Sequence, residues 1–285
     1  MKFEHLVPQV HCAGLGAVIG DMVGSVYEED GKAPPKYPFF ARRSAATDDT
    51  VLTLAVAEGL MDSWGKEESV VLVRIRNSMQ SYAKKYPCTE VGLGYGGRFL
   101  GWIDNPVPYN SFGNGSAMRV SSVGWLFNTL EDVLKFARLT ALPSHNHPEG
   151  IKGAQATAAA IFLARCGVDK ADIASWITKT FGYNLRLRAE DIRNSYRWDI
   201  SCQKSVPEAI FSFLQGENFE DVVRFAIGLG GDTDTIGAIA GSIAEAYYPI
   251  PQKYRQEALR RLDPFLLKTW RRYEAFVAEN VAARE

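Results

Sequence analysis

The sequence predicts an all-α protein folded as one compact domain. Apolar residues recur at steps of three and four along eight segments, which is the periodicity of a helix with one buried face. Glycine or proline often closes these segments, as expected at helix ends. No convincing series of strands with alternating apolar residues is present. Together these three observations favour a helical fold.

The expected helices follow one another along most of the chain. Ala and Leu, which favour helix, are frequent in them. Two other stretches, 28–40 and 94–120, are expected to be loops, because the first is rich in Pro and the second in Gly, Asn and Pro. Long ordered loops in compact domains usually carry function. In chain order the expected helices are VLTLAVAEGLMDSW (51–64), VLVRIRNSMQSYAKKY (71–86), LEDVLKFARLTAL (130–142), GAQATAAAIFLARCG (153–167), KADIASWITKTFG (170–182), SVPEAIFSFLQG (205–216), FEDVVRFAIGLG (219–230) and TIGAIAGSIAEAYY (235–248).

Composition narrows the class of protein. With 285 residues, 46% hydrophobic and 23% charged, the chain can bury a large core as a single domain over 1–285. A formal net charge of −1 provides no global field for nucleic acid or an anionic membrane. No signal-peptide core or membrane-length apolar run is found, so we expect no membrane association. The four cysteines form no CxxC pair, which argues against a zinc knuckle or disulfide framework and suits the cytoplasm.

A cluster of acidic and hydroxyl residues stands at the start of the expected helix 235–248. Asp232, Asp234 and Thr235 exceed what helix capping needs, because one such residue supplies the cap, worth about 1 kcal/mol. Two nearby carboxylates repel, and one takes up a proton unless a cation lies between them. Capping remains the alternative explanation for this cluster taken alone.

A second cluster of the same kind precedes the expected helix 51–64. It consists of Thr47, Asp48, Asp49 and Thr50. If the two helix starts converge, four carboxylates and several hydroxyls make an all-oxygen ligand set that suits Mg²⁺ or Mn²⁺ rather than Zn²⁺. Enough carboxylates are present for two ions.

Small residues and a third acidic group occur near the N-terminus. Gly16, Gly20 and Gly24 are four apart, and on a helix this spacing lets another helix approach closely. A dinucleotide-binding loop is rejected, because Ile19 occupies the third glycine position and no strand precedes. Asp21 and the run at 28–30 follow, and the run alone is equally consistent with a solvated turn.

Five ordered blocks across residues 13–248 resemble the ADP-ribosylglycohydrolase family, which includes the dinitrogenase-reductase-activating glycohydrolase and the ADP-ribosyl-acceptor hydrolases. The order and spacing of the blocks make the resemblance specific. The resemblance implies a compact helical fold with a two-magnesium centre in a cleft. The blocks are GAVIGDMVGSVYE, TDDT, SFGNGSAMRV, SHNHPEGIKGA and GLGGDTDTIGAIAGSIAEAYY.

The resemblance also implies roles for individual residues. Glu28 resembles the active-site glutamate of the family, and Asp48 and Asp234 join it as expected catalytic residues. The ligands of two Mg²⁺ ions, with Mn²⁺ as the alternative, are then Thr47, Asp48, Asp49, Asp232, Asp234 and Thr235. The SFGNGSAMRV block resembles the loop that holds the diphosphate and ribose, and His145 a histidine that helps hold ADP-ribose. The expected substrate-binding residues are Ser111, Phe112, Gly113, Asn114, Gly115 and His145.

Several neighbouring residues have alternative explanations. Phe112 can stack on adenine or close over the ribose, or it can be a core aromatic. For Arg119 we favour a structural ion pair over ligand contact. His145 and His147 cannot share a helical face, so a zinc site there is disfavoured. Asp104 is the nearest candidate for an additional aspartate that some family members carry.

The implied activity is Mg²⁺-dependent hydrolysis of the glycosidic bond between ADP-ribose and an acceptor. We expect a monomer acting on an ADP-ribosylated protein or small molecule, and on nucleic acid only if it is ADP-ribosylated. The alternatives are a non-catalytic crystallin-like member and an ADP-ribose-binding protein. A haloacid-dehalogenase-type phosphatase would need a strand before its aspartate. An isoprenoid synthase would need DDxxD within a helix, and TDDTV does not match.

Overall fold

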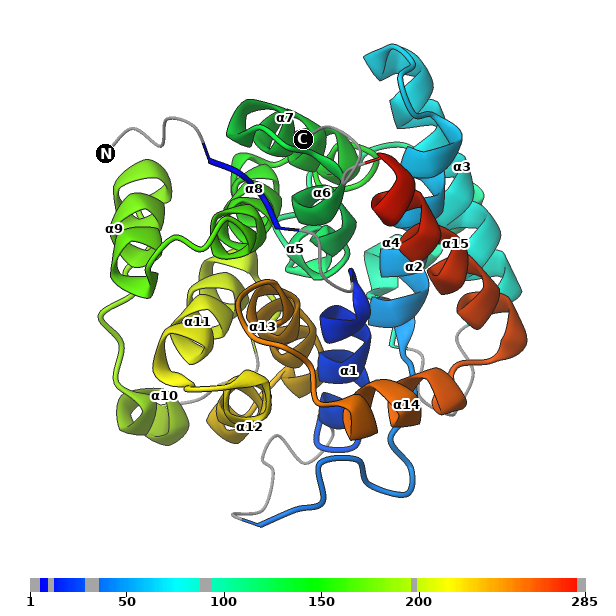
Figure 1. Cartoon of the computed structure of the whole chain (residues 1–285). Helices are drawn as coiled ribbons and strands as arrows, with labels where there is room; N and C mark the ends of the chain where they lie inside the picture. Colours follow the sequence, from blue (N-terminus) through cyan, green and yellow to red (C-terminus); the bar gives the residue numbers. More distant parts are fainter. Residues whose placement is uncertain (1–5, 10–12, 29–35, 88–93, 196–198, 281–285) are drawn as a thin grey trace.

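The structure is a computed structural model that describes residues 6–9, 13–28, 36–87, 94–195 and 199–280 (Figure 1). These residues form helices and one isolated bridge between Gly113 and Ser201, so the all-α prediction is confirmed. The helices are α1 (Leu15–Gly24), α2 (Asp48–Asp62), α3 (Glu68–Lys85), α4 (Gly97–Asp104), α5 (Gly115–Met118), α6 (Ser121–Leu126), α7 (Leu130–Ala141), α8 (Pro148–Arg165), α9 (Lys170–Phe181), α10 (Ala189–Ser195), α11 (Cys202–Gln215), α12 (Phe219–Leu229), α13 (Thr233–Tyr247), α14 (Gln252–Arg261) and α15 (Pro264–Asn280).

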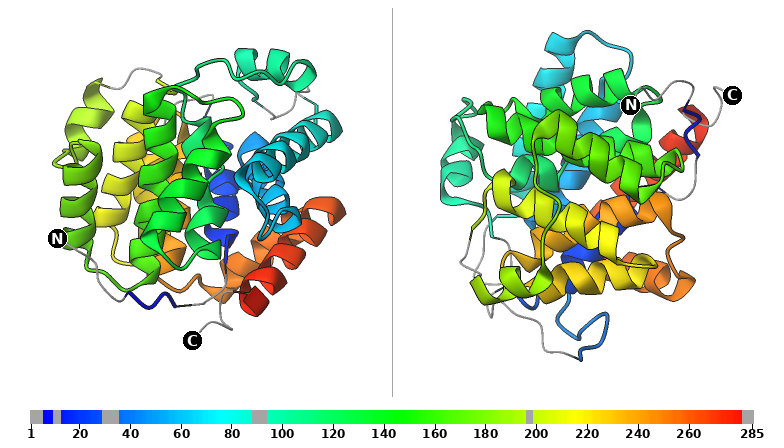
Figure 2. Two further views of the ribbon diagram at one scale, coloured as in Figure 1. Left: turned by 90° about the horizontal axis from the view of Figure 1, so that it is seen from above. Right: turned by 90° about the vertical axis from the view of Figure 1, so that its left-hand side faces the viewer.

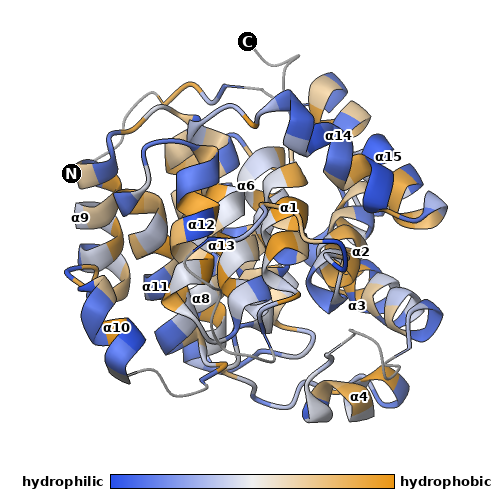
Figure 3. Ribbon diagram, turned by 90° about the horizontal axis from the view of Figure 1, so that it is seen from below, coloured by the Kyte–Doolittle hydropathy of each residue, from blue (hydrophilic) through white to orange (hydrophobic). Residues whose placement is uncertain are grey.

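Helix α1 lies between two groups of helices (Figure 2, left). On one side α13 packs on α8, α11 and α12, and on the other side α2 packs on α3 and α15. One continuous cluster of buried apolar side chains joins both groups. Figure 3 shows mostly hydrophilic residues on the peripheral α10, whereas α1 and α8 are white to orange. In the described part of the chain, no helix is both long enough and apolar enough to cross a membrane.

The crossing of α1 and α13 explains the glycine spacing near the N-terminus. A Cβ added to Gly20 would lie 2.0 Å from the carbonyl oxygen of Gly237, and one added to Gly16 would lie 2.2 Å from that of Gly241. Such distances are far inside van der Waals contact, so only glycine allows the two backbones to approach this closely. The predicted close helix approach is confirmed, and it brings the end of α1 to the start of α13.

The expected loop over 94–120 is wrong in part. This segment contains α4 and the short α5. Glycines in GRFLGWID weaken the helical signal in the sequence. In α4, however, Phe99 and Trp102 are buried on one face with their rings stacked 5.0 Å apart. Burial of two aromatic side chains therefore outweighs the low helix propensity of glycine.

Candidate active site

A cavity of about 400 Å³ lies where the first turns of α2, α4 and α13 meet the glycine-rich loop before α5. Of the predicted site residues, all but Thr47 and Phe112 line it. The structure therefore brings the two acidic clusters and the glycine-rich loop to one place. The predicted residues that line the cavity are Glu28, Asp48, Asp49, Ser111, Gly113, Asn114, Gly115, His145, Asp232, Asp234 and Thr235.

The first turn of α2 is held by a buried carboxylate from α1. Asp21 accepts hydrogen bonds from the backbone N–H groups of Thr47 at 3.0 Å and Thr50 at 3.1 Å, and also from both threonine hydroxyls. The Thr47 hydroxyl also caps α2 by accepting the N–H of Asp49 at 3.2 Å. Thr47 thus positions the acidic cluster, and its side chain does not line the cavity. Asp48 and Asp49 occupy the first turn that this arrangement fixes.

The first turn of α13 carries the second cluster. Asp232 Oδ2 accepts a hydrogen bond from Asn114 Nδ2 at 2.6 Å, which joins the cluster to the glycine-rich loop. The hydroxyl of Thr235 donates to Asp49 Oδ2 at 3.3 Å, which joins it to α2. Carboxylate oxygens of Glu28, Asp232 and Asp234 all lie within 4.8 Å of one another, so these three side chains can share one cation.

Burial and mutual repulsion disfavour ionisation of these carboxyl groups. Burial raises the pKa of Asp48 to about 7, and the nearby charges of Asp21, Asp232 and Glu28 add to the effect. Burial likewise raises the pKa values of Asp49 and Asp234 well above the usual range for aspartate. A bound cation would reverse this penalty, because it stabilises the charged forms.

A carboxylate oxygen without a hydrogen-bond donor supports a cation site beside Asp49. Asp49 Oδ1 is buried and has no hydrogen-bond partner among the described residues. A buried carboxylate oxygen without a donor is costly, and a metal ion is one of the few groups that can satisfy it. Because every candidate ligand offers oxygen, the donor set fits a hard divalent cation such as Mg²⁺ or Mn²⁺.

The glycine-rich loop forms another wall of the cavity. The N–H of Asn114 donates to the carbonyl oxygen of Ile200 at 2.7 Å, and the N–H of Cys202 donates to that of Phe112 at 2.9 Å. These bonds fix the loop against the segment that leads into α11. A Cβ added to Gly115 would lie 3.4 Å from His145 Nε2, so glycine leaves room beside the imidazole.

His145 is buried and uncharged. Its Nδ1 lies 2.8 Å from the Ser144 hydroxyl. Burial lowers the pKa of His145 well below its ordinary value, and the charges of Arg119 and Arg98 lower it further. The residue therefore offers Nε2 to the cavity as a neutral hydrogen-bonding group across the physiological range.

The ion-pair prediction for Arg119 is not supported. This fully buried side chain donates to the carbonyl oxygens of Gly115 at 2.9 Å and Thr140 at 3.3 Å, and to the Ser144 hydroxyl at 2.9 Å. No ion pair to it occurs within the described ranges. Burial lowers its pKa to about 10. The side chain lines the cavity and braces the loop by hydrogen bonds to neutral oxygens.

The structure also shows where Phe112, His147 and Asp104 lie, for which the sequence allowed more than one role. Phe112 is 48% exposed and meets the His147 ring edge-on at 5.4 Å, so the core-aromatic alternative is excluded. His147 caps α8, because its Nδ1 accepts the N–H of Glu149 at 3.1 Å. Asp104 is exposed at the end of α4 and does not line the cavity.

Among the cavity-lining residues that sequence reasoning did not assign to the site, Arg98 and Tyr109 carry polar side chains. The Arg98 guanidinium lies over the Tyr109 ring, 4.8 Å from its centroid, and donates to the Tyr109 carbonyl oxygen. The Tyr109 ring lies 6.1 Å from that of His145. The run GYGGRF, with a cation directly after glycines that line the cavity, was the available signal.

The fold and the cavity define a helical protein with a carboxylate-rich cleft beside a glycine-rich loop. The sequence profile described as ADP-ribosylglycohydrolase matches residues 9–283. ADP-ribosylhydrolase ARH3 of Mus musculus is 30% identical, with 85% of each chain aligned. ADP-ribosylarginine hydrolase Tri1 of Pseudomonas putida (strain GB-1) is 25% identical over 87% of this chain and 72% of its own length.

A solved structure shows the same fold. It is described as an ADP-ribosylglycohydrolase-related protein complex, and it matches with a TM-score of 0.68 at 22% identity over 93% of this chain and 95% of its own. The chain belongs to the ADP-ribosylglycohydrolase family, and it is a hydrolase of glycosidic bonds.

Proposed function

We propose that this enzyme uses Mg²⁺ to hydrolyse the bond between C1″ of ADP-ribose and an acceptor. The observation that carries the proposal is the convergence of two carboxylate clusters on one cavity that also contains the glycine-rich loop. The unpartnered Asp49 Oδ1 adds a specific place for a cation.

The metal centre is proposed to hold two Mg²⁺ ions, with Mn²⁺ as the alternative. Bound metal would supply positive charge that lowers the pKa of a water molecule or a ribose hydroxyl. The proposed ligands at the starts of α2 and α13 are Asp48, Asp49, Asp232, Asp234 and Thr235. Thr47, expected from the sequence as a further ligand, would instead support them, because its hydroxyl bonds Asp21 and caps α2.

Glu28 is proposed to act on the scissile bond. It lines the cavity beside Asp232 and Asp234, and can orient the bond or serve as general acid or base. Cleavage would pass through an oxocarbenium-like state, as in other glycoside hydrolysis. Asp48 and Asp234 would act as ligands, since their ionised forms need a cation.

The rest of ADP-ribose is assigned to the loop before α5. The backbone N–H of Gly115 at the start of α5 can bind the diphosphate, and His145 Nε2 lies beside it. The N–H groups of Ser111 and Gly113 donate to the Ser144 carbonyl oxygen and the Ser111 hydroxyl, so these residues would shape the loop. The exposed Phe112 ring is available to stack on adenine, with the ring edge supported by His147. Asn114 links this region to the acidic end through Asp232.

The acceptor is proposed to be an ADP-ribosylated protein or a small molecule. ARH3 is named an ADP-ribosylhydrolase and Tri1 an ADP-ribosylarginine hydrolase, which supports ADP-ribosylated substrates as a class. Nucleic acid would be a substrate only if ADP-ribosylated. We further propose a monomeric, single-domain protein that works in the cytoplasm. A non-catalytic crystallin-like or purely ADP-ribose-binding protein is disfavoured, because both carboxylate clusters are intact.

The first experiment is calorimetric titration of ADP-ribose with Mg²⁺ and again after chelation. We expect binding that requires Mg²⁺. Asp234→Ala should then abolish turnover of an ADP-ribosylated substrate with little loss of folded protein, because it removes a ligand without emptying the apolar core. Asp104→Ala is the matched control, since this aspartate is exposed and does not line the cavity. Wild-type turnover in Asp234→Ala would show that the metal assignment is wrong.

A further inference from the structure

The connection between α1 and α2 carries a proposed site residue near each of its ends. The carboxylate of Glu28 follows α1 closely, and the capping residue Thr47 directly precedes α2. The described parts of this connection, 25–28 and 36–47, contain neither helix nor strand. Their position is therefore set by contacts with other elements. Asp21 fixes the Thr47 end of the connection. The stretch before Thr47 is fixed by a different set of contacts.

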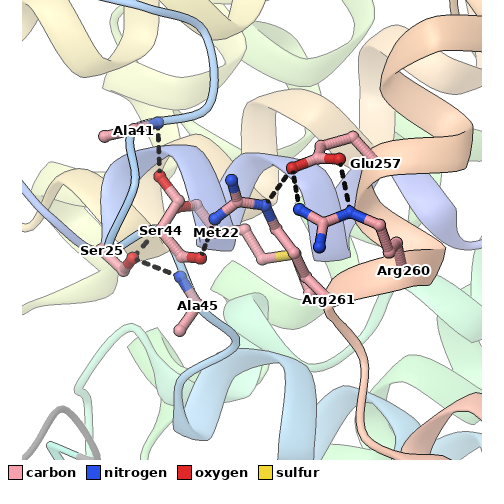
Figure 4. A network of polar contacts seen from close by, with 8 residues as sticks. All are labelled: Met22, Ser25, Ala41, Ser44, Ala45, Glu257, Arg260 and Arg261. Atoms are coloured by element: carbon pink, nitrogen blue, oxygen red, sulfur yellow. Dashed lines mark hydrogen bonds and ion pairs between the residues drawn. The ribbon is translucent and has the colours of Figure 1, made fainter.

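A chain of hydrogen bonds runs from α14 to this connection (Figure 4). Arg261 Nη1 donates to the Ser44 carbonyl oxygen at 2.5 Å, and the Ser44 hydroxyl accepts the N–H of Ala41 at 3.0 Å. The next residue, Ala45, donates its N–H to Ser25 Oγ at 3.4 Å. Ser25 Oγ in turn donates to the Met22 carbonyl oxygen in α1 at 3.0 Å. These bonds tie the two ends of the connection together.

Arg261 is itself held in place. Its Nε donates to Glu257 Oε1 at 2.7 Å, and its guanidinium lies 5.2 Å from the centroid of the Phe40 ring. The Arg261 side chain is only 14% exposed, and Ser44 is buried. An anchored guanidinium that donates to a buried carbonyl is a strong, directional contact. Neither Arg261 nor Ser44 lines the cavity, so any effect on the site acts through the connection.

We propose that Arg261 is a positioning residue for the acidic centre. Through Ser44 and Ala45 it holds Ser25, three residues before Glu28, against the residues that lead into Thr47. Loss of the Arg261 contact would displace Glu28 relative to α13 and weaken the shared cation position of Glu28, Asp232 and Asp234. The inference rests on the proposed metal-dependent function, and its test is built to fail separately from that function.

The adjacent arginine provides a matched control. Arg260 donates to the same Glu257 carboxylate, at 2.9 Å and 2.7 Å, but its side chain is 69% exposed. Arg261→Ala and Arg260→Ala therefore both remove a guanidinium from Glu257, and only the first removes the bond to Ser44. Ser25→Ala cuts the same chain at its far end without touching α14. Arg261→Lys keeps a donor within reach of Ser44.

The first readout is Mg²⁺ affinity, titrated with the metal alone by calorimetry. We expect Arg261→Ala and Ser25→Ala to weaken it about tenfold, which is typical for loss of an outer-shell contact. Arg260→Ala should remain within about twofold of wild type, and Arg261→Lys should recover part of the loss. Equal losses in Arg260→Ala and Arg261→Ala, or no loss in either, would overturn the proposal.

The second readout is a double-mutant cycle in turnover. If Arg261 acts through Glu28, Arg261→Ala should lower turnover about tenfold in the wild-type background and have little effect on a Glu28→Gln background. Additive losses would contradict a positioning role. If the wild-type protein neither binds Mg²⁺ nor turns over substrate, the proposed function fails. Hydrogen exchange at the Ala45 and Thr47 amides then still decides the proposal, because it must rise in Arg261→Ala and not in Arg260→Ala.

Discussion

At the scale of single residues, the cavity wall contains both a carboxyl cluster and two guanidinium groups. Four carboxyl groups from the starts of α2 and α13 join Glu28 in the cluster, whereas Arg98 and Arg119 lie near His145. Arg119 donates to neutral oxygens and braces the loop. Arg98 is exposed and rests on Tyr109, so its guanidinium can meet an incoming anion. This arrangement suits the proposed ligand, with the ribose of ADP-ribose near the carboxyl groups and its phosphates near Arg98.

This arrangement predicts a binding role for Arg98. Arg98→Gln should weaken ADP-ribose binding about tenfold and reduce its dependence on salt, because a charge-assisted contact is lost. Adenosine, which has no phosphate, should bind the variant and the wild type equally. Titration calorimetry at two salt concentrations measures both effects. Arg76→Gln on α3 is the control, since its guanidinium contacts the adjacent Asn77. An equal loss for adenosine would point to a structural role for Arg98 instead.

At the scale of helices, the α1–α13 crossing positions Asp21 and Asp234, and it depends on glycine. Gly20→Ala should destabilise the protein by about 3 kcal/mol or more, because the new methyl group meets the Gly237 carbonyl oxygen and the backbones must separate. Urea unfolding measures this. Gly101→Ala in α4 is the control, since a Cβ there meets nothing within 4 Å and should be neutral or slightly stabilising. Similar stabilities for Gly20→Ala and wild type would show that the crossing tolerates separation.

The sequence predicts that a helix is present more accurately than it predicts where the helix begins. The eight expected helices are all present, because apolar periodicity is a property of each segment alone. The expected starts of some helices lie too late, because polar capping residues begin these helices. Thus α2 begins at Asp48 after the Thr47 cap, and α8 begins at Pro148 after the His147 cap. Proline at the first helical position needs no N–H partner, so it starts this helix without breaking it.

In the candidate site, too, some features follow from local sequence and others depend on tertiary contacts. The acidic clusters and the glycine-rich loop are contiguous in sequence, so local chemistry and family resemblance could find them. Asp21 acts on Thr47 across 26 positions, and Arg98 becomes a cavity residue only because α4 folds back onto Tyr109. Such contacts depend on tertiary packing, which no local pattern contains. The hydrogen-bond chain from Arg261 to Ser25 lies beyond sequence reasoning for the same reason.

At the scale of the whole molecule, we expect the buried carboxyl cluster to make the free energy of unfolding depend on pH and on the proposed metal. Burial raises the pKa of Asp21 to about 6 and that of Asp48 to about 7, compared with about 3.9 in an unfolded chain. At pH values between the unfolded pKa and the folded pKa values, the folded state binds more protons than the unfolded state. Without metal, the contribution of these two carboxyl groups to the free energy of unfolding is therefore fully present below about pH 4. This contribution is lost as pH rises through about 7.

A divalent cation should reverse this trend, because it binds the ionised carboxylates of the folded state only. We expect saturating Mg²⁺ to raise the melting temperature clearly at about pH 8 and only slightly at about pH 5.5, where protons compete for the same oxygens. Thermal unfolding with Mg²⁺ and with a chelator at both pH values measures the difference. Asp234→Asn removes one of the competing carboxylates and should shrink the Mg²⁺ effect at about pH 8. A Mg²⁺ shift of equal size at both pH values would mean that the cation binds somewhere other than this buried cluster.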